Sequence, residues 1–122
     1  MRDTIEVKNW EQYFSDFNER NLARLAKLEI FGELGVQQEV KKMPFAGISV
    51  ELKGADAPRI EIMLGGLSME KKPHLTHNVP KVKKILRRER EDNLDDAIEF
   101  ESESGTKTLL YFEPGLEIPI AA

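Results

Sequence analysis

The sequence of 122 residues contains no cysteine. Disulfide bonds, thiolate metal sites and cysteine nucleophiles are therefore excluded. Eight glycines and six prolines are too few for a low-complexity chain, whereas 40% of the residues are hydrophobic and 33% are charged. This composition predicts a folded protein, and its length fits a single domain over residues 1–122.

Long hydrophobic runs are also missing. No stretch approaches the roughly 18 consecutive apolar residues of a membrane-spanning helix. The first residues, Met1 to Glu6, lack the apolar core of a secretion signal. We therefore expect a cytoplasmic protein that has no membrane partner.

The sequence carries none of the common catalytic or cofactor-binding motifs. It lacks a dinucleotide-binding glycine pattern, a phosphate-binding loop, a nucleophile elbow, a zinc-protease motif and a calcium loop. We therefore predict no catalytic residue, no cofactor and no metal. The absences favour a non-catalytic protein over an enzyme.

Aromatic residues are few, and four of the nine lie in one segment. They recur at i, i+3, i+4 and i+7, which predicts an amphipathic helix of about three turns: Trp10, Tyr13, Phe14 and Phe17. Asn9 fits the N-cap position, and Gln12 completes the pattern of a capping box. We expect this stripe to pack in the core and not to hold a cofactor.

After Asn21 the hydrophobic period changes from 3.6 to 2, which predicts strands. Pro44 is expected to end the second of them, and Leu52 is expected to face the core in the third. The segment 82–90 also fits a helix, although the strand is favoured. The alternating segments are 26–31, 36–41, 46–53, 60–64, 74–79, 82–88, 98–101 and 106–112.

The predicted fold class is α+β: one N-terminal amphipathic helix packed on a mainly antiparallel, strongly curved sheet or partly open barrel of about seven strands. The last strand is apolar on both faces, since Leu109 and Tyr111 alternate with Leu110 and Phe112. Both of its faces need cover, which predicts a homodimer or a contact with another protein. Prolines and a glycine make residues 113–122 a predicted loose C-terminal arm.

Charge is distributed unevenly along the chain. Residues 71–90 carry a net charge of +7, and residues 91–122 carry −8. Pairing of these charges across neighbouring strands is the favoured interpretation. The alternative is a site for an anionic ligand or nucleic acid, built from Lys81, Lys83, Lys84, Arg87, Arg88 and Arg90. Nucleic acid is not favoured, because the pI is about 5.3 and no Phe, Tyr or Trp lies in the basic segment.

The two histidines, His74 and His77, form a second candidate binding site. On a strand, this spacing sends the two rings to opposite faces, so that they cannot share a metal. We expect His77 to be partly buried and neutral, and His74 to be more exposed. A small enzyme or ligand carrier built around His77 is a further alternative.

Several segments together resemble a small bacterial family of unknown function. They are the aromatic helix, the P-F-A-G-I-S strand from Pro44, the H-L-T-H segment from His74 and the G-T-K-T-L-L-Y-F strand from Gly105. The resemblance implies one compact domain. It carries no established activity and therefore assigns no catalytic residues.

Overall fold

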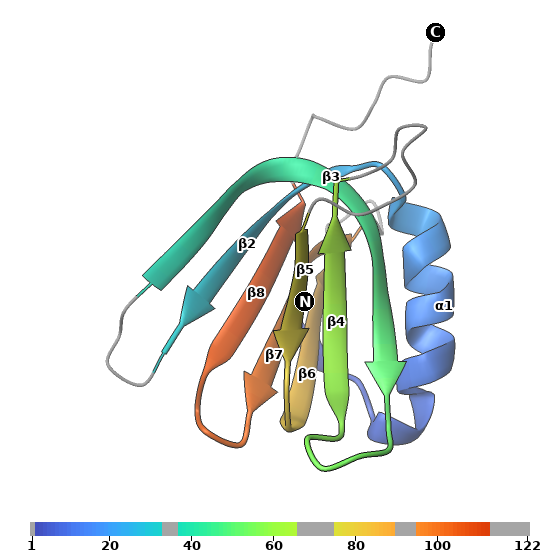
Figure 1. Cartoon of the computed structure of the whole chain (residues 1–122). Helices are drawn as coiled ribbons and strands as arrows, with labels where there is room; N and C mark the ends of the chain where they lie inside the picture. The colour runs from blue at the N-terminus through green and yellow to red at the C-terminus, as the bar shows by residue number, and fades with distance from the viewer. Residues whose placement is uncertain (1, 33–36, 66–74, 90–94, 113–122) are drawn as a thin grey trace, which may run out of the picture.

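The computed structural model describes residues 2–32, 37–65, 75–89 and 95–112 (Figure 1). This part of the chain forms a short 3-10 helix η1 (Val7–Asn9), one α-helix α1 (Trp10–Asn21) and eight strands. The strands are β1 (Arg2–Thr4), β2 (Leu25–Phe31), β3 (Gln37–Glu51), β4 (Arg59–Leu64), β5 (Leu75–Val79), β6 (Val82–Glu89), β7 (Asp95–Ser102) and β8 (Lys107–Phe112). All pairs are antiparallel, in the order β1-β6-β7-β8-β2-β3-β4-β5. The predicted α+β class is confirmed, and β1 is the strand that the sequence did not indicate.

The sheet folds over into two layers because β3 changes its partner along its length. The first half of β3 pairs with β2, and the second half pairs with β4. In Figure 1, β3 arches across the top of the molecule from one layer to the other. The strands at the two ends of the order, β1 and β5, do not pair within the described residues, so the sheet is not closed into a barrel.

The prediction that Pro44 ends a strand is wrong. Pro44 lies inside β3, opposite the first residue of β2, Leu25, where the pairing with β2 finishes. Its carbonyl oxygen accepts a hydrogen bond of 2.7 Å from the backbone N–H of Gly65 at the end of β4. A proline has no N–H to donate, but its carbonyl oxygen still accepts a hydrogen bond at the point where β3 passes between the layers.

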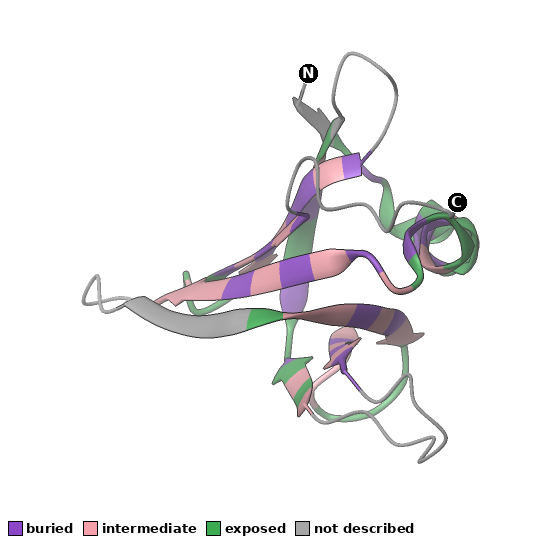
Figure 2. Ribbon diagram, turned by 90° about the horizontal axis from the view of Figure 1, so that it is seen from above, coloured by how far each residue is buried: buried purple, intermediate pink, exposed green. Residues whose placement is uncertain are grey.

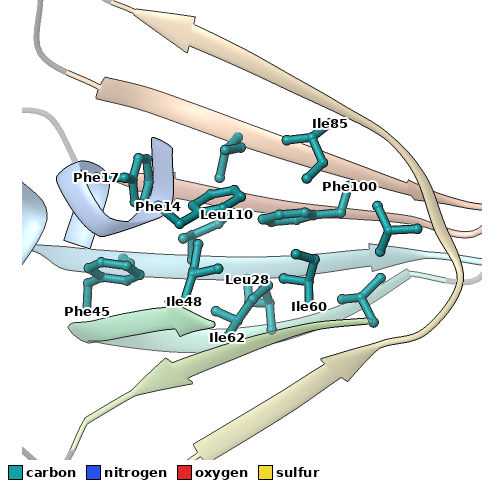
Figure 3. Packing of buried hydrophobic residues seen from close by; sticks show 14 of the residues in the cluster. Phe14, Phe17, Leu28, Phe45, Ile48, Ile60, Ile62, Ile85, Phe100 and Leu110 are labelled. Atoms are coloured by element: carbon teal, nitrogen blue, oxygen red, sulfur yellow. The ribbon is translucent and has the colours of Figure 1, made fainter. Parts of the chain in front are cut away.

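The aromatic stripe of α1 packs into the core, as the sequence predicts. Phe14 and Phe17 are fully buried and point between the two layers (Figure 3). The Phe14 ring lies 6.0 Å from that of Phe100 on β7, and the Phe17 ring lies 5.5 Å from that of Phe45 on β3 (centroid distances). The helix therefore contacts both layers and fills the space between them at one side.

Three local predictions are wrong: the side-chain cap at Asn9, the capping box with Gln12 and the burial of Leu52. Asn9 occupies the N-cap position, but its side chain makes no capping hydrogen bond. Gln12 donates to Asp16 one turn later instead of completing a capping box. The preceding 3-10 turn holds Asn9 in a helical conformation (φ −104°, ψ −1°), whereas a capping side chain requires an extended backbone. Leu52 is exposed, because β3 ends at Glu51.

The predicted strand at 98–101 is longer than expected, since β7 runs over Asp95–Ser102. Along β4, residues alternate between buried and half-buried positions, and such alternation is visible as coloured bands in Figure 2. The segment from Val82 is the strand β6 and not a helix. The turn between β7 and β8 contains Gly105 at φ +93°, a conformation that suits glycine. The predicted arm at 113–122 lies outside the described residues.

Candidate functional site

His77 lies on the inner face of β5, directly opposite the buried Ile62 of β4. It is half-buried, and burial lowers the pKa of its imidazole below the usual 6.5, as expected. His74, which the sequence predicts to be the more exposed histidine, lies outside the described residues. Within those residues, no group of three or more His, Asp or Glu side chains could hold a metal ion.

The charges of the basic segment pair with those of β7, which confirms the favoured interpretation. Lys83 Nζ lies 3.6 Å from a carboxylate oxygen of Glu101. Arg88 Nε lies 2.9 Å from Oδ2 of Asp96. Lys84 is the register partner of Glu101. These contacts are on the surface, so they neutralise charge and contribute little to stability. Arg90 lies outside the described residues.

Lys81 has a structural place at the corner between β5 and β6. Its backbone adopts a positive φ of 47°. Its N–H donates to the carbonyl of Asp56 in the β3–β4 turn, and its carbonyl accepts from Glu103 N–H in the β7–β8 turn, both at 2.9 Å. The corner therefore ties together the turns of the two layers through backbone contacts, which do not use the lysine charge.

Arg87 differs from the rest of the basic segment because it faces inward. Its register partner is the buried Ile98, so both side chains lie on the inner face of the sheet. The guanidinium carbon lies 5.7 Å from the centre of the Tyr13 ring, and that of Arg20 lies 5.6 Å from the same centre. Arg87 and Tyr13 also line an open cavity of about 290 Å³ together with Thr4, Ile5, Glu6 and Asn9.

The Tyr13 side chain lines this cavity, and its hydroxyl oxygen is buried. Burial raises the pKa of Tyr13 to about 12, and the nearby Asp95 carboxylate acts in the same direction. The guanidinium groups of Arg20 and Arg87 oppose this rise. Tyr13 is therefore a neutral phenol at any physiological pH.

A buried polar cluster next to Tyr13 was missed by the sequence analysis. Asp95 is 4% exposed and accepts hydrogen bonds from Arg20 Nε (3.0 Å) and from Asn21 Nδ2 (2.8 Å). Arg24 donates to Asn21 Oδ1 and to the backbone carbonyl of Asp95, and its guanidinium carbon lies 4.6 Å from the centre of the Phe112 ring. The cluster joins the end of α1 to the start of β7. Arg20, Asn21 and Arg24 are close in sequence, but Asp95 is 71 to 75 residues further along the chain, so only the fold brings it to them.

The outer face of the sheet formed by β6, β7, β8 and β2 is organised in two rows that cross the strands. The first row is basic and apolar: Arg88, Ala97, Tyr111 and Lys27. The second row is acidic and apolar: Leu86, Glu99, Leu109 and Glu29. The Tyr111 hydroxyl is hydrogen-bonded to Glu29, and burial raises the pKa of Tyr111. Since α1 packs on the opposite, inner face, it does not cover these rows.

The described helices are too short or too polar to cross a membrane. No curated protein matches the chain in sequence. The crystal structure of the Bacillus subtilis YojF protein is similar in fold: the TM-score is 0.50 with 11% sequence identity, over 93% of this chain and 95% of that chain. The resemblance to a family of unknown function is confirmed, because the model of one such family, DUF5335, matches residues 1–120: the chain belongs to this family of unknown function.

Proposed function

We propose that this domain works through protein contacts and not through catalysis, and that its first partner is a second copy of the chain. The proposed interface is the outer face of β6, β7, β8 and β2. The observation that carries the proposal is the arrangement of this face in one basic and one acidic row, each containing apolar residues. A central strand with apolar residues on both faces supports it, because α1 covers the inner face alone.

Each row is complementary to the other row of a second copy related by two-fold symmetry. A two-fold axis that lies in the interface, runs across the strands and passes between the rows places each row over the opposite row of the partner. Lys27 then faces Glu29 of the partner subunit, and Leu109 faces the partner's Tyr111. Such an isologous contact closes at two copies. The strand directions of the two stacked sheets are then nearly aligned, as in aligned sheet packing.

The charges on this face are already partly neutralised within one chain, which lowers the cost of burying them. Lys27 Nζ lies 3.9 Å from a Glu29 carboxylate oxygen, and Arg88 is paired with Asp96. The dimer adds a second opposite charge to each of Lys27 and Glu29. Complementary charges of this kind fix the register of an interface more than they add affinity.

The direct test is light scattering combined with size-exclusion chromatography at micromolar concentration. We expect a mass of twice the chain's 14.0 kDa. Lys27→Glu alone, or Glu29→Lys alone, places like charges opposite each other twice per dimer, so the dissociation constant should rise on the order of 100-fold.

The double variant Lys27→Glu/Glu29→Lys restores opposite charges across the axis and should restore the dimer. Lys53→Glu, which makes the same charge change in the exposed turn after β3, is the matched control and should leave the mass unchanged. A mass of 14.0 kDa at every concentration would reject the homodimer. Dimers that persist equally in both single variants would reject this interface.

A further inference from the structure

We propose that the edge of β3 beside α1 binds an extended, basic peptide segment of a partner protein. The second half of β3 pairs with β4 on one edge, and α1 runs along its other edge (Figure 1). An open groove of about 200 Å³ lies between α1 and this edge. Its lining includes Glu11, Ser15 and Asn18 of α1 and Ile48 and Val50 of β3.

The edge of β3 that faces α1 is already paired at two points before it reaches the open part of the groove. Phe45 exchanges backbone hydrogen bonds of 2.8 Å with Ala23 and Arg24, just before β2 begins. Further along, Asn18 takes the place of a neighbouring strand. Its Nδ2 donates to the Ile48 carbonyl at 2.8 Å, and its Oδ1 accepts from the Ile48 N–H at 2.9 Å. The backbone groups of Ile48 therefore point away from β4 and toward α1.

Val50 is the next residue on this edge, two positions after Ile48. In an antiparallel ladder, every second residue directs its N–H and carbonyl to the same side. The Val50 backbone groups therefore also point away from β4 and into the groove, and within the described residues no group pairs with them. A free donor and acceptor at a strand edge are completed by the backbone of an added strand.

The dimensions of the groove fit a length of chain and not an enclosed small ligand. Its volume is below the usual range for small-molecule pockets. Because β3 ends at Glu51 and the next residue, Leu52, is exposed, a peptide that pairs with Val50 can continue past the end of the strand. The half-buried side chain of Val50 is a suitable cross-strand neighbour for a β-branched residue.

Glu11 sets the preferred charge of the peptide. It is the one charged residue among the described residues of the lining, it is exposed, and it forms no ion pair with another described residue. A lysine of the peptide placed near Val50 neutralises this carboxylate, whereas a glutamate is repelled by it. The proposed ligand is therefore an extended segment in which β-branched and basic residues alternate.

The first test is a titration with the capped peptide acetyl-VKVKV-amide, followed by backbone amide NMR. The peptide acetyl-VEVEV-amide reverses the charge. A VKVKV peptide with every backbone nitrogen methylated cannot donate a hydrogen bond. We expect saturable shifts for the basic peptide in the millimolar range, centred on Ser15 and Val50. The acidic peptide should bind more weakly, and the methylated peptide should not bind.

Amide hydrogen exchange tests the open edge directly. In the free protein, the Val50 N–H should exchange at least about tenfold faster than the Ile48 N–H, which is hydrogen-bonded to Asn18. Basic peptide at about ten times its dissociation constant should slow the exchange of Val50 about tenfold and leave Ile48 unchanged.

Substitutions on α1 separate shape from charge. Ser15→Leu fills the groove from an exposed helix position and should weaken peptide binding at least about tenfold. Gln12→Leu is the matched control, exposed on the same helix outside the groove lining, and should leave binding unchanged. Glu11→Gln should weaken binding of the basic peptide about two- to fivefold, as for an exposed ion pair. Glu19→Gln, the same charge change elsewhere on α1, should not weaken it.

Four results would overturn the proposal. They are the absence of saturable shifts at Val50, equal binding of the methylated or the acidic peptide, an equal loss in Ser15→Leu and Gln12→Leu, and a Val50 N–H that exchanges as slowly as that of Ile48 in the free protein. The proposed dimer is tested by its mass and uses the outer face of β6, β7, β8 and β2, so failure of one proposal leaves the other intact.

Discussion

Substitution of Asp95 by asparagine removes one charge from the buried cluster at the end of α1 while it keeps the shape of the side chain. The carboxylate accepts three hydrogen bonds, two from Arg20 (3.0 and 3.3 Å) and one from Asn21 (2.8 Å). The new amide nitrogen would face donors, so at least one of these contacts becomes repulsive. Asp95→Asn therefore breaks the contact between α1 and β7 without changing the volume of the core.

The size of the effect follows from burial. Removal of one partner from a fully buried ion pair costs about 3–5 kcal/mol. The Arg20 side chain is 43% exposed and regains some hydration, so we expect a loss of about 2–4 kcal/mol in the free energy of unfolding. With an unfolding entropy of about 2.1 cal/mol/K per residue, a loss of about 3 kcal/mol lowers the Tm by roughly 12 °C.

The assay is urea unfolding followed by tryptophan fluorescence. Trp10 is the only tryptophan, is buried and lies on the same helix, so its emission reports the loss of the packing of α1. Asp96→Asn is the matched control, because it breaks the surface pair with Arg88 and should cost less than about 1 kcal/mol. If Asp95→Asn costs no more than Asp96→Asn, the cluster does not hold α1 on the sheet and the reasoning is wrong.

Three further predictions concern packing and ionisation. Phe14→Ala should lower the free energy of unfolding by about 3–5 kcal/mol, because a fully buried ring in contact with Phe100 is lost; a change below about 1 kcal/mol in urea unfolding would contradict this packing. Burial lowers the pKa of His77, so the unfolded chain binds more protons than the folded chain below about pH 6.5, and the contribution of His77 to stability falls as the pH drops through this value. His77→Gln should remove this part of the pH dependence of stability. A pKa above 6.5 for His77 in an NMR titration would contradict the prediction. The phenolate absorbance of Tyr13 should appear only near pH 12 in the folded protein; ionisation near pH 10 before unfolding would show that its hydroxyl is not buried.

The fold class and most of the elements can be predicted from local patterns in the sequence. The helix is predictable because four aromatic residues repeat at helical spacing, and an amphipathic segment must bury that stripe. The strands β4, β7 and β8 are predictable because alternation places every second residue on one face. The pattern of β6 also fits a helix, and the strand is favoured there because a hairpin follows it. The pairing of the basic with the acidic segment was also predictable, since neighbouring segments of opposite charge favour a hairpin.

Contacts between segments distant in sequence become visible only in the folded chain. Pro44 lies within a strand because β3 changes its partner there, which depends on where β2 and β4 lie and not on the residues around Pro44. The inward position of Arg87 follows from the β6–β7 register, which separates it from the neighbouring basic residues. Tyr13, Arg20 and Asp95 meet because the end of α1 docks beside the start of β7. Local periodicity records which face of an element is buried, whereas the partner of that face is fixed only when the whole chain packs.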